Sequence, residues 1–290
     1  MKTAILASLA LTLLGALQQK APDDVLFERD IVYGKGAVED LKLNLARPKA
    51  ADGARPCVVV IHGGGWAAGS KEGHNSQTWD LVKRGYVSAT VGYRFAPKHL
   101  FPAQVEDVKC AVRYLRANAE KYGIDPQRIG AVGFSAGAHL SMMLGTMGKE
   151  DGLEGEGGNP EQPSQVNAVV AFFGPTDFVN LEFPDASRPI VEKWIGGTKK
   201  DKPEEYRKAS PIVYVNKGDA PTLLIQGTKD PLVPHAQATA MVEAMTAAGV
   251  PGRCDLIVGA GHGWGGAELN RTVDATYAFF DQHLKPKPKK

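Results

Sequence analysis

A serine stands at the centre of the pentapeptide GFSAG (residues 133–137), between an apolar run that ends at Phe134 and an apolar helical pattern that begins at Ala136. A serine on such a sharp strand-to-helix turn is exposed above a sheet, where its hydroxyl can attack a carbonyl carbon. G-x-S-x-G alone is a weak pattern, but this strand–turn–helix context makes it a strong one. We therefore predict that Ser135 is a nucleophile rather than a structural turn residue.

A serine nucleophile needs a base to take its proton and an acid to orient that base. Asp230 follows the apolar run 223–226 and His262 follows the run 256–258, so both are expected at the carboxyl ends of late strands. Asp177 and Asp255 are rival acids, although Asp177 is more simply a cap for the segment after it. The chain order Ser, Asp, His favours Asp230 as the acid and His262 as the base.

The segment HGGGW (residues 62–66) directly follows another apolar run. Its glycines allow the backbone to turn so that the amides of Gly63 and Gly64, with the amide of Ala136, can bind an oxyanion. The Lys-Ser/Thr of a phosphate-binding P-loop and the G-x-G-x-x-G of a dinucleotide fold are absent. His62 is predicted to be a structural hydrogen-bonding residue beneath the loop. Trp66 and Trp264 either line the substrate pocket or only wall these loops.

The elements that position these residues alternate along the chain. Residues 57–61 form a continuous, largely β-branched run, which is typical of a strand buried on both faces of a parallel sheet. The first two strands instead alternate apolar and polar residues, as half-exposed antiparallel strands do. The fold class is therefore α/β, with a mostly parallel, doubly wound sheet and an antiparallel N-terminal start. Strands are predicted over 25–32, 41–45, 57–61, 87–91, 129–134, 166–173, 221–226 and 254–258, and helices over 102–122, 136–147, 235–248 and 270–283.

Two stretches interrupt this alternation within a predicted single domain, residues 21–284. Residues 148–165 are acidic and glycine-rich and precede a strand, so we expect a surface loop at the end of the sheet opposite the site; a calcium site is the alternative. Residues 178–219 leave the carboxyl end of a strand and contain large apolar side chains. They are predicted to form a small cap-like insertion over the site.

The composition is that of an ordinary globular protein: 290 residues, 43% hydrophobic, 23% charged, with 34 basic against 32 acidic side chains. Disorder and collagen-like structure are thereby excluded. Residues 1–20 resemble a cleaved signal peptide because their apolar run is too short to span a bilayer. The basic tail 285–290 lacks aromatic residues and contains prolines, so nucleic-acid binding is not expected. We expect a secreted or periplasmic protein with no membrane association after leader removal.

Further motifs accompany the candidate site: YRFAP (93–97), FPAQ (101–104), YGIDP (122–126), SAGAHL (135–140) and GTKDPLVP (227–234). With them the chain resembles the hormone-sensitive-lipase-like esterases of the α/β-hydrolase superfamily, and is most similar to the bacterial feruloyl/acetyl (xylan) esterase-like branch. The resemblance implies the α/β-hydrolase fold, a Ser135–Asp230–His262 triad, oxyanion donors at Gly63, Gly64 and Ala136, and no metal or cofactor. Ala138 and Phe134 depart from the usual residues of the group, and the mature N-terminus has no room for its large helical cap.

The expected function is hydrolysis of short-chain carboxylic esters through an acyl-enzyme. Export and the resemblance together suggest a small-molecule or polysaccharide-linked substrate, such as an acetyl or feruloyl ester of a plant polysaccharide. An arylformamidase or peptidase would use the same triad on an amide. A non-catalytic binding protein on this scaffold is the alternative from another functional class.

Overall fold

The apolar run predicted as a doubly buried strand forms β3 (Arg55–Ile61), which lies inside an eight-stranded sheet. Six of the seven residues of β3 are buried. A computed structural model describes residues 20–36, 39–50 and 53–285 of the chain. The predicted signal peptide, apart from Lys20, and the predicted basic tail, apart from Lys285, lie outside the described residues.

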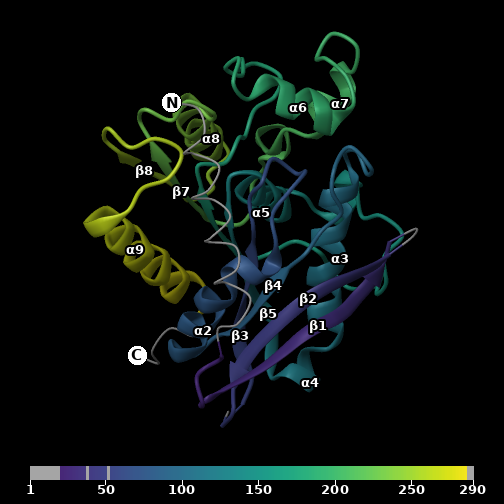
Figure 1. Ribbon diagram of the computed structural model, residues 1–290, viewed down its shortest axis with the longest axis vertical. Coiled ribbons are helices and arrows are strands. Elements are labelled where there is room, and N and C mark those ends of the chain that lie inside the picture. The colour runs from purple at the N-terminus through teal and green to yellow at the C-terminus, as the bar shows by residue number, and fades with distance from the viewer. Residues whose placement is uncertain (1–19, 37–38, 51–52, 286–290) are drawn as a thin grey trace, which may run out of the picture.

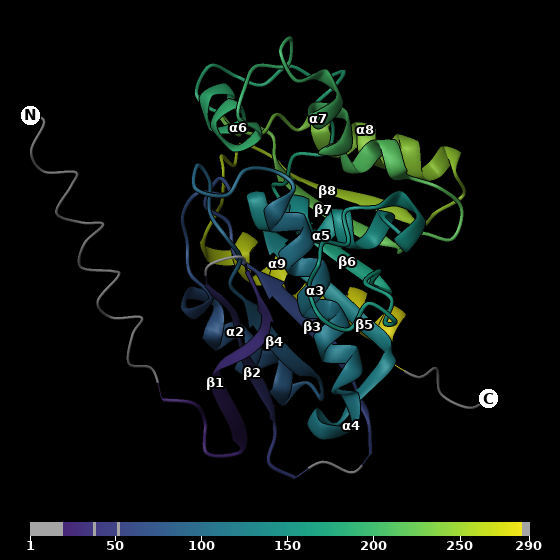
Figure 2. The same ribbon diagram turned by 90° about the vertical axis from the view of Figure 1, so that its right-hand side faces the viewer.

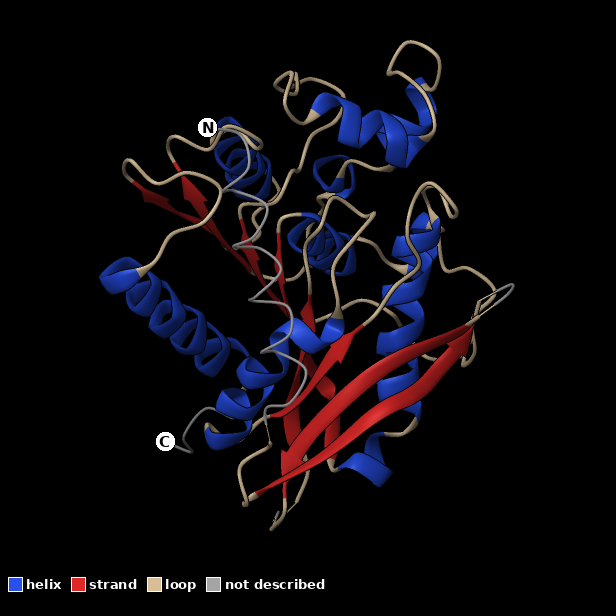
Figure 3. Cartoon of the chain, viewed as in Figure 1, coloured by secondary structure: helices blue, strands red, loops and turns tan. Residues whose placement is uncertain are grey.

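The sheet has the strand order β1-β2-β4-β3-β5-β6-β7-β8. β1 pairs antiparallel with β2, and β2 pairs antiparallel with β4. Every later pairing is parallel, which confirms the mostly parallel sheet with an antiparallel start (Figure 3). The other strands are β1 (Val25–Lys35), β2 (Asp40–Pro48), β4 (Val87–Val91), β5 (Ile124–Phe134), β6 (Ala168–Phe172), β7 (Thr222–Gly227) and β8 (Gly252–Ile257).

Helices cover both faces of this sheet (Figure 1). Successive residues of a strand point to opposite faces, and β3 shows the division. Val59 belongs to the apolar cluster shared with α3 (Ala103–Ala117), α5 (Ala136–Thr146) and α8 (Ala236–Ala247). Val58 and Val60 belong to the cluster shared with α2 (Asn75–Lys83) and α9 (Gly266–Leu284). The doubly wound arrangement thus follows from apolar side chains on both faces of the central strands.

Several element boundaries differ from the sequence-based expectations. Helix α2 and the short 3-10 helix η2 (Lys71–His74) before it were not predicted. The single helix expected over 102–122 is interrupted at Asn118, whose side-chain amide donates to the carbonyl of Tyr114 at 2.9 Å, and residues 119–122 form the separate turn α4 (Ala119–Tyr122). β5 begins five residues early because Ile124 pairs with Arg55.

The acidic segment 148–165 contains one short 3-10 helix, η3 (Lys149–Asp151), and is fastened to α3. The Glu154 carboxylate pairs with Lys109 Nζ at 2.8 Å and with Arg113 Nη1 at 2.5 Å, and both cationic side chains are at most 2% exposed. One carboxylate therefore forms ion pairs with two buried cations. Among the described residues, no group of three or more His, Cys, Asp or Glu side chains is arranged to hold a metal ion.

The segment 178–219 folds as α6 (Arg188–Ile195), α7 (Pro203–Lys208) and the 3-10 helix η4 (Pro211–Tyr214). Figures 1 and 2 both show α6 and α7 at one end of the molecule, beyond the sheet and apart from α4 at the other end. The insertion therefore lies at the end of the sheet reached by the carboxyl ends of the parallel strands. Within the described ranges, no helix is both long enough and apolar enough to span a membrane.

Candidate active site

Ser135 occupies a strained turn between β5 and α5, with φ of 53° and ψ of −118°. Few residues other than glycine adopt positive φ, and such strain often marks functional positions. The flanking glycines are needed for space: a Cβ on Gly133 would lie 2.1 Å from the Gly137 carbonyl oxygen, and one on Gly137 would lie 2.1 Å from the Ile61 carbonyl oxygen. The turn can therefore form only with glycine on both sides of the serine.

The structure brings the three predicted triad residues together from three loops at the carboxyl ends of β5, β7 and β8. Ser135 Oγ lies 2.9 Å from His262 Nε2, and His262 Nδ1 lies 2.7 Å from Asp230 Oδ2. Because an ionised carboxylate only accepts hydrogen bonds, Nδ1–H donates to Asp230 and Nε2 is left to accept the serine proton. This is the geometry of an activated serine nucleophile.

Asp230 is held by more than the histidine. Its side chain is fully buried, its Oδ1 accepts from the amides of Leu232 and Val233 at 2.8 and 3.0 Å, and its Oδ2 also accepts from Gln226 Nε2 at 2.9 Å. Burial raises the pKa of Asp230, but hydrogen bonds from His262 and the two amides outweigh it and lower the pKa below its ordinary value of 3.8. The acid is thus ionised and fixed. Gln226 was not singled out from the sequence.

The rival acids lie elsewhere. Asp177 Oδ1 accepts from the amides of Val179 and Asn180 at 2.8 and 2.9 Å, so it caps the start of the insertion. Asp255 forms ion pairs with Arg253 and Arg271.

The glycine loop lies against the nucleophile turn. A Cβ on Gly63 would lie 2.7 Å from the Phe134 carbonyl oxygen, so the two backbones touch there. The pocket that contains Ser135 and His262 is lined by Gly64 and by Gly65, which was not predicted, but not by Gly63. Gly64 and Gly65 have φ of 115° and 58°, which are angles that glycine adopts readily and that no sequence pattern reveals. Ala136 begins α5, where backbone amides have no acceptor within the helix.

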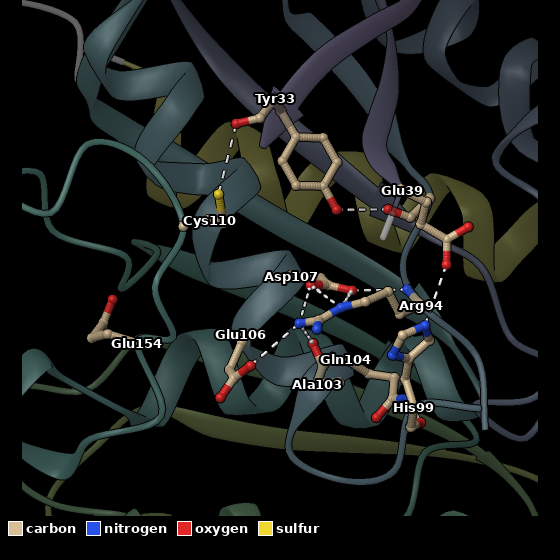
Figure 4. A network of polar contacts seen from close by, with 12 residues as sticks. Tyr33, Glu39, Arg94, His99, Ala103, Gln104, Glu106, Asp107, Cys110 and Glu154 are labelled. Atoms are coloured by element: carbon tan, nitrogen blue, oxygen red, sulfur yellow. Dashed lines mark hydrogen bonds and ion pairs between the residues drawn. The ribbon is translucent and has the colours of Figure 1, made fainter. Parts of the chain in front are cut away.

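The loop that follows β4 supports the glycine loop from below. Tyr93 Oη donates to the His62 carbonyl at 2.9 Å, and the His62 ring stacks on Tyr93 while its Nδ1–H donates to the Gly63 carbonyl at 2.7 Å. Arg94 fixes this support to α3 through Asp107, with Nε at 2.9 and 3.0 Å from the two carboxylate oxygens (Figure 4). His62 is therefore a structural residue, as predicted, and burial lowers its pKa to about 4.

His139 joins three parts of the site. It is fully buried, its Nε2–H donates to the Ala209 carbonyl of the insertion at 2.8 Å, and its Nδ1 accepts from the Trp66 indole at 3.2 Å. Trp66 in turn stacks on Trp194 of α6, with ring centroids 3.9 Å apart. Burial lowers the pKa of His139 to about 4, so the ring is neutral at pH 7.

The pocket above the triad has a volume of about 290 Å³ and is mainly apolar. Trp66, Phe173 and, from the insertion, Phe183, Ile190 and Val191 line it. The other predicted tryptophan does not: Gly263, with φ of 118°, turns the chain after His262, and Trp264 Nε1 donates to Thr272 of α9 at 3.0 Å. Of the two alternatives for Trp264, the geometry therefore favours the one in which it only walls the loop, since it is not among the residues that line the pocket around Ser135.

The chain is similar in sequence and in structure to known esterases. The sequence model of the family described as BD-FAE matches residues 43–245. The chain is 33% identical over 227 residues to esterase LipQ and 31% identical over 278 residues to esterase LipC, both from Mycobacterium tuberculosis, covering 76% and 92% of this chain. It spans only 53% and 67% of those two relatives.

Two solved structures are similar over nearly their whole length. One is described as a truncated form of a carbohydrate esterase from gut microbiota, with a TM-score of 0.80, 27% identity and coverage of 91% of this chain and 99% of that one. The other is Thermogutta terrifontis esterase 2 phosphonylated by sarin, with a TM-score of 0.80, 26% identity and coverage of 93% and 99%.

Proposed function

This chain belongs to the BD-FAE family of α/β-hydrolase esterases, and we propose that it is a serine esterase that hydrolyses short-chain carboxylic esters. The observation that carries the proposal is the continuous hydrogen-bonded line from Ser135 Oγ through His262 to Asp230, with distances of 2.9 and 2.7 Å, at the base of a mainly apolar pocket.

The reaction proceeds through an acyl-enzyme. His262 Nε2 takes the proton of Ser135 as Oγ attacks the ester carbonyl, and Asp230 holds the imidazole in the tautomer that this requires. Amides of the glycine loop and of Ala136 stabilise the tetrahedral oxyanion. His262 then gives its proton to the leaving alcohol. Water attacks the acyl group with the same base, which releases the acid and restores the serine.

We propose polysaccharide-linked acetyl or feruloyl esters as the substrate class. Support comes from the similar structure described as a carbohydrate esterase and from the leader predicted over residues 1–20, which also supports a secreted or periplasmic location. Fractionation of expressing cells tests the location: enzyme found only in the cytoplasm, with its leader intact, contradicts it.

The first experiment is hydrolysis of nitrophenyl esters from acetyl to long acyl, with acetylated xylan and a methyl hydroxycinnamate in parallel. Wild type is compared with Ser135→Ala and with Ser88→Ala, a control whose buried hydroxyl donates to the Val58 carbonyl outside the pocket. We expect short-chain turnover that Ser135→Ala abolishes and Ser88→Ala retains. Undiminished turnover by Ser135→Ala contradicts the mechanism. Release of acetate from xylan, or turnover of the cinnamate, identifies the ester class.

Two outcomes would lead to the alternatives. Turnover of amides without turnover of esters would assign the triad to a peptidase or arylformamidase. Failure of a fluorophosphonate probe to label Ser135 would favour a non-catalytic protein.

A further inference from the structure

A second apolar pocket lies beside the catalytic pocket, on the face of the sheet that α2 and α9 cover. Its volume is about 160 Å³, and its walls include Val60, Phe134, Phe172, Trp264 and Val273. Nothing in the proposed mechanism uses this space, which we call the α9 pocket. Its mainly apolar walls suit a hydrocarbon chain or a similar apolar group.

Among the residues that the structure describes, Phe173 is the one that lines both pockets. Its ring lies against the catalytic base, with centroids 4.7 Å apart from the His262 ring, and meets Trp264 edge to face at 5.6 Å. Phe173 thus stands between the reacting groups on one side and the α9 pocket on the other.

The backbone of Phe173 is strained to put the ring there. Its φ is 45°, a value that bulky side chains rarely adopt, and its amide donates to the Ile225 carbonyl at 2.8 Å. Such conformations persist where the surrounding structure holds them, and they cluster at functional sites. The position therefore points to a role for the ring that a smaller residue would not fill.

We propose that Phe173 is a specificity-determining partition: it ends the catalytic pocket and excludes medium and long acyl chains from the α9 pocket. The inference rests on the proposed esterase function and adds to it a physical cause for a short-chain preference. It also assigns the α9 pocket a ligand class, the apolar acyl chain, that is admitted only when the partition is removed.

The test is Phe173→Gly, because glycine adopts a φ of 45° without strain. The readout is the ratio of kcat/KM for decanoate to kcat/KM for acetate nitrophenyl esters, which cancels any general loss from a loosened His262. Each methylene that becomes buried contributes about fourfold, so four of them in the α9 pocket raise the ratio on the order of 100-fold. An unchanged ratio in a folded Phe173→Gly enzyme that still hydrolyses acetate overturns the proposal.

A second substitution, in the wall of the α9 pocket, tests whether that pocket is the one that accepts the acyl chain. Val273→Phe adds a ring on the α9 side of the pocket; combined with Phe173→Gly, it is expected to return the ratio towards the wild-type value. Alone it is expected to leave the wild-type ratio unchanged. A changed ratio in Val273→Phe alone, or a wild type that already prefers decanoate, means that the wild-type pockets communicate and overturns the partition. Absence of all ester turnover in wild type is a different result and refutes the proposed function instead.

Discussion

Acidification should destabilise the fold through His139. This ring is neutral and fully buried, and protonation of Nδ1 would break the hydrogen bond that it accepts from Trp66. Burial lowers its pKa from 6.5 to about 4, so between these values the unfolded chain binds more protons than the folded one. The stability that the neutral ring contributes is therefore complete above pH 6.5 and is lost progressively as the pH falls towards 4.

The size of the effect follows from the two pKa values. A pH of 5 lies about 1.5 units below the ordinary pKa of 6.5, so the unfolded histidine is mostly protonated there, whereas the folded one is still largely neutral. At about 1.4 kcal/mol per unit, the free energy of unfolding falls by about 2 kcal/mol between pH 7 and pH 5 because of this residue alone. His62 also has a pKa of about 4 through burial and is expected to contribute in the same direction.

The assay is urea unfolding followed by tryptophan fluorescence at pH 7, 6 and 5, for wild type and for His139→Gln. Any difference in stability between the two proteins at pH 7 cancels, because only changes with pH are compared. Since glutamine does not titrate, the pH dependence of the variant's stability lacks the His139 contribution. Because His62 and all other titrating groups remain in both proteins, the difference between the two pH dependences isolates His139. We expect the variant to lose about 2 kcal/mol less than wild type between pH 7 and pH 5. Parallel pH dependences would refute the reasoning.

Three further predictions concern the site and its supports. Asp230→Asn should keep the fold but lower kcat on the order of 10⁴-fold, since an amide favours the wrong tautomer of His262, which steady-state kinetics would reveal; a kcat within tenfold of wild type would contradict the assigned role. Gly63→Ala should lower the free energy of unfolding by about 1–3 kcal/mol and remove most of the activity, because its Cβ would lie 2.7 Å from the Phe134 carbonyl oxygen. An unchanged thermal unfolding temperature would be inconsistent with this contact. Glu154→Ala should lower the free energy of unfolding by about 3 kcal/mol, because two buried cations of α3 lose their carboxylate. If residues 148–165 of this variant resist proteolysis as well as those of wild type, Glu154 does not anchor the segment.

The parts of the fold that sequence reasoning predicted are those with strong local signals. The run 57–61 is apolar on both strand faces, and the structure buries it on both. Gly133 is required by its contact with the Gly137 carbonyl inside the same pentapeptide, so GFSAG carries part of its own geometry, whereas Gly137 is required by the distant Ile61 carbonyl. The order of Ser135, Asp230 and His262 along alternating strands was sufficient to place them at one end of the sheet.

The features that were missed depend on contacts distant in sequence or on backbone angles. Helix α2 is only nine residues long, and it buries Trp79 and Leu81 against elements distant in sequence. Gly65 faces the pocket through its positive φ, which three equivalent glycines in a row do not disclose. Gly263 likewise turns Trp264 away from the catalytic pocket.

The insertion and the loops of the sheet contribute different parts of the site, and this separation suggests how the substrate preference of the protein could be redesigned. All three triad residues lie outside residues 178–219, whereas much of the pocket wall lies inside them. A designer could therefore exchange the insertion as one cassette to change substrate preference while leaving the proton-transfer line in place. The contacts that attach the cassette to the rest of the site include the stacking of Trp194 on Trp66 and the Ala209 carbonyl that accepts from His139. A grafted segment that lacks either contact would remove a support of Trp66 or of His139, so substrate range is best varied at the pocket-lining positions before Trp194, namely Phe183, Ile190 and Val191.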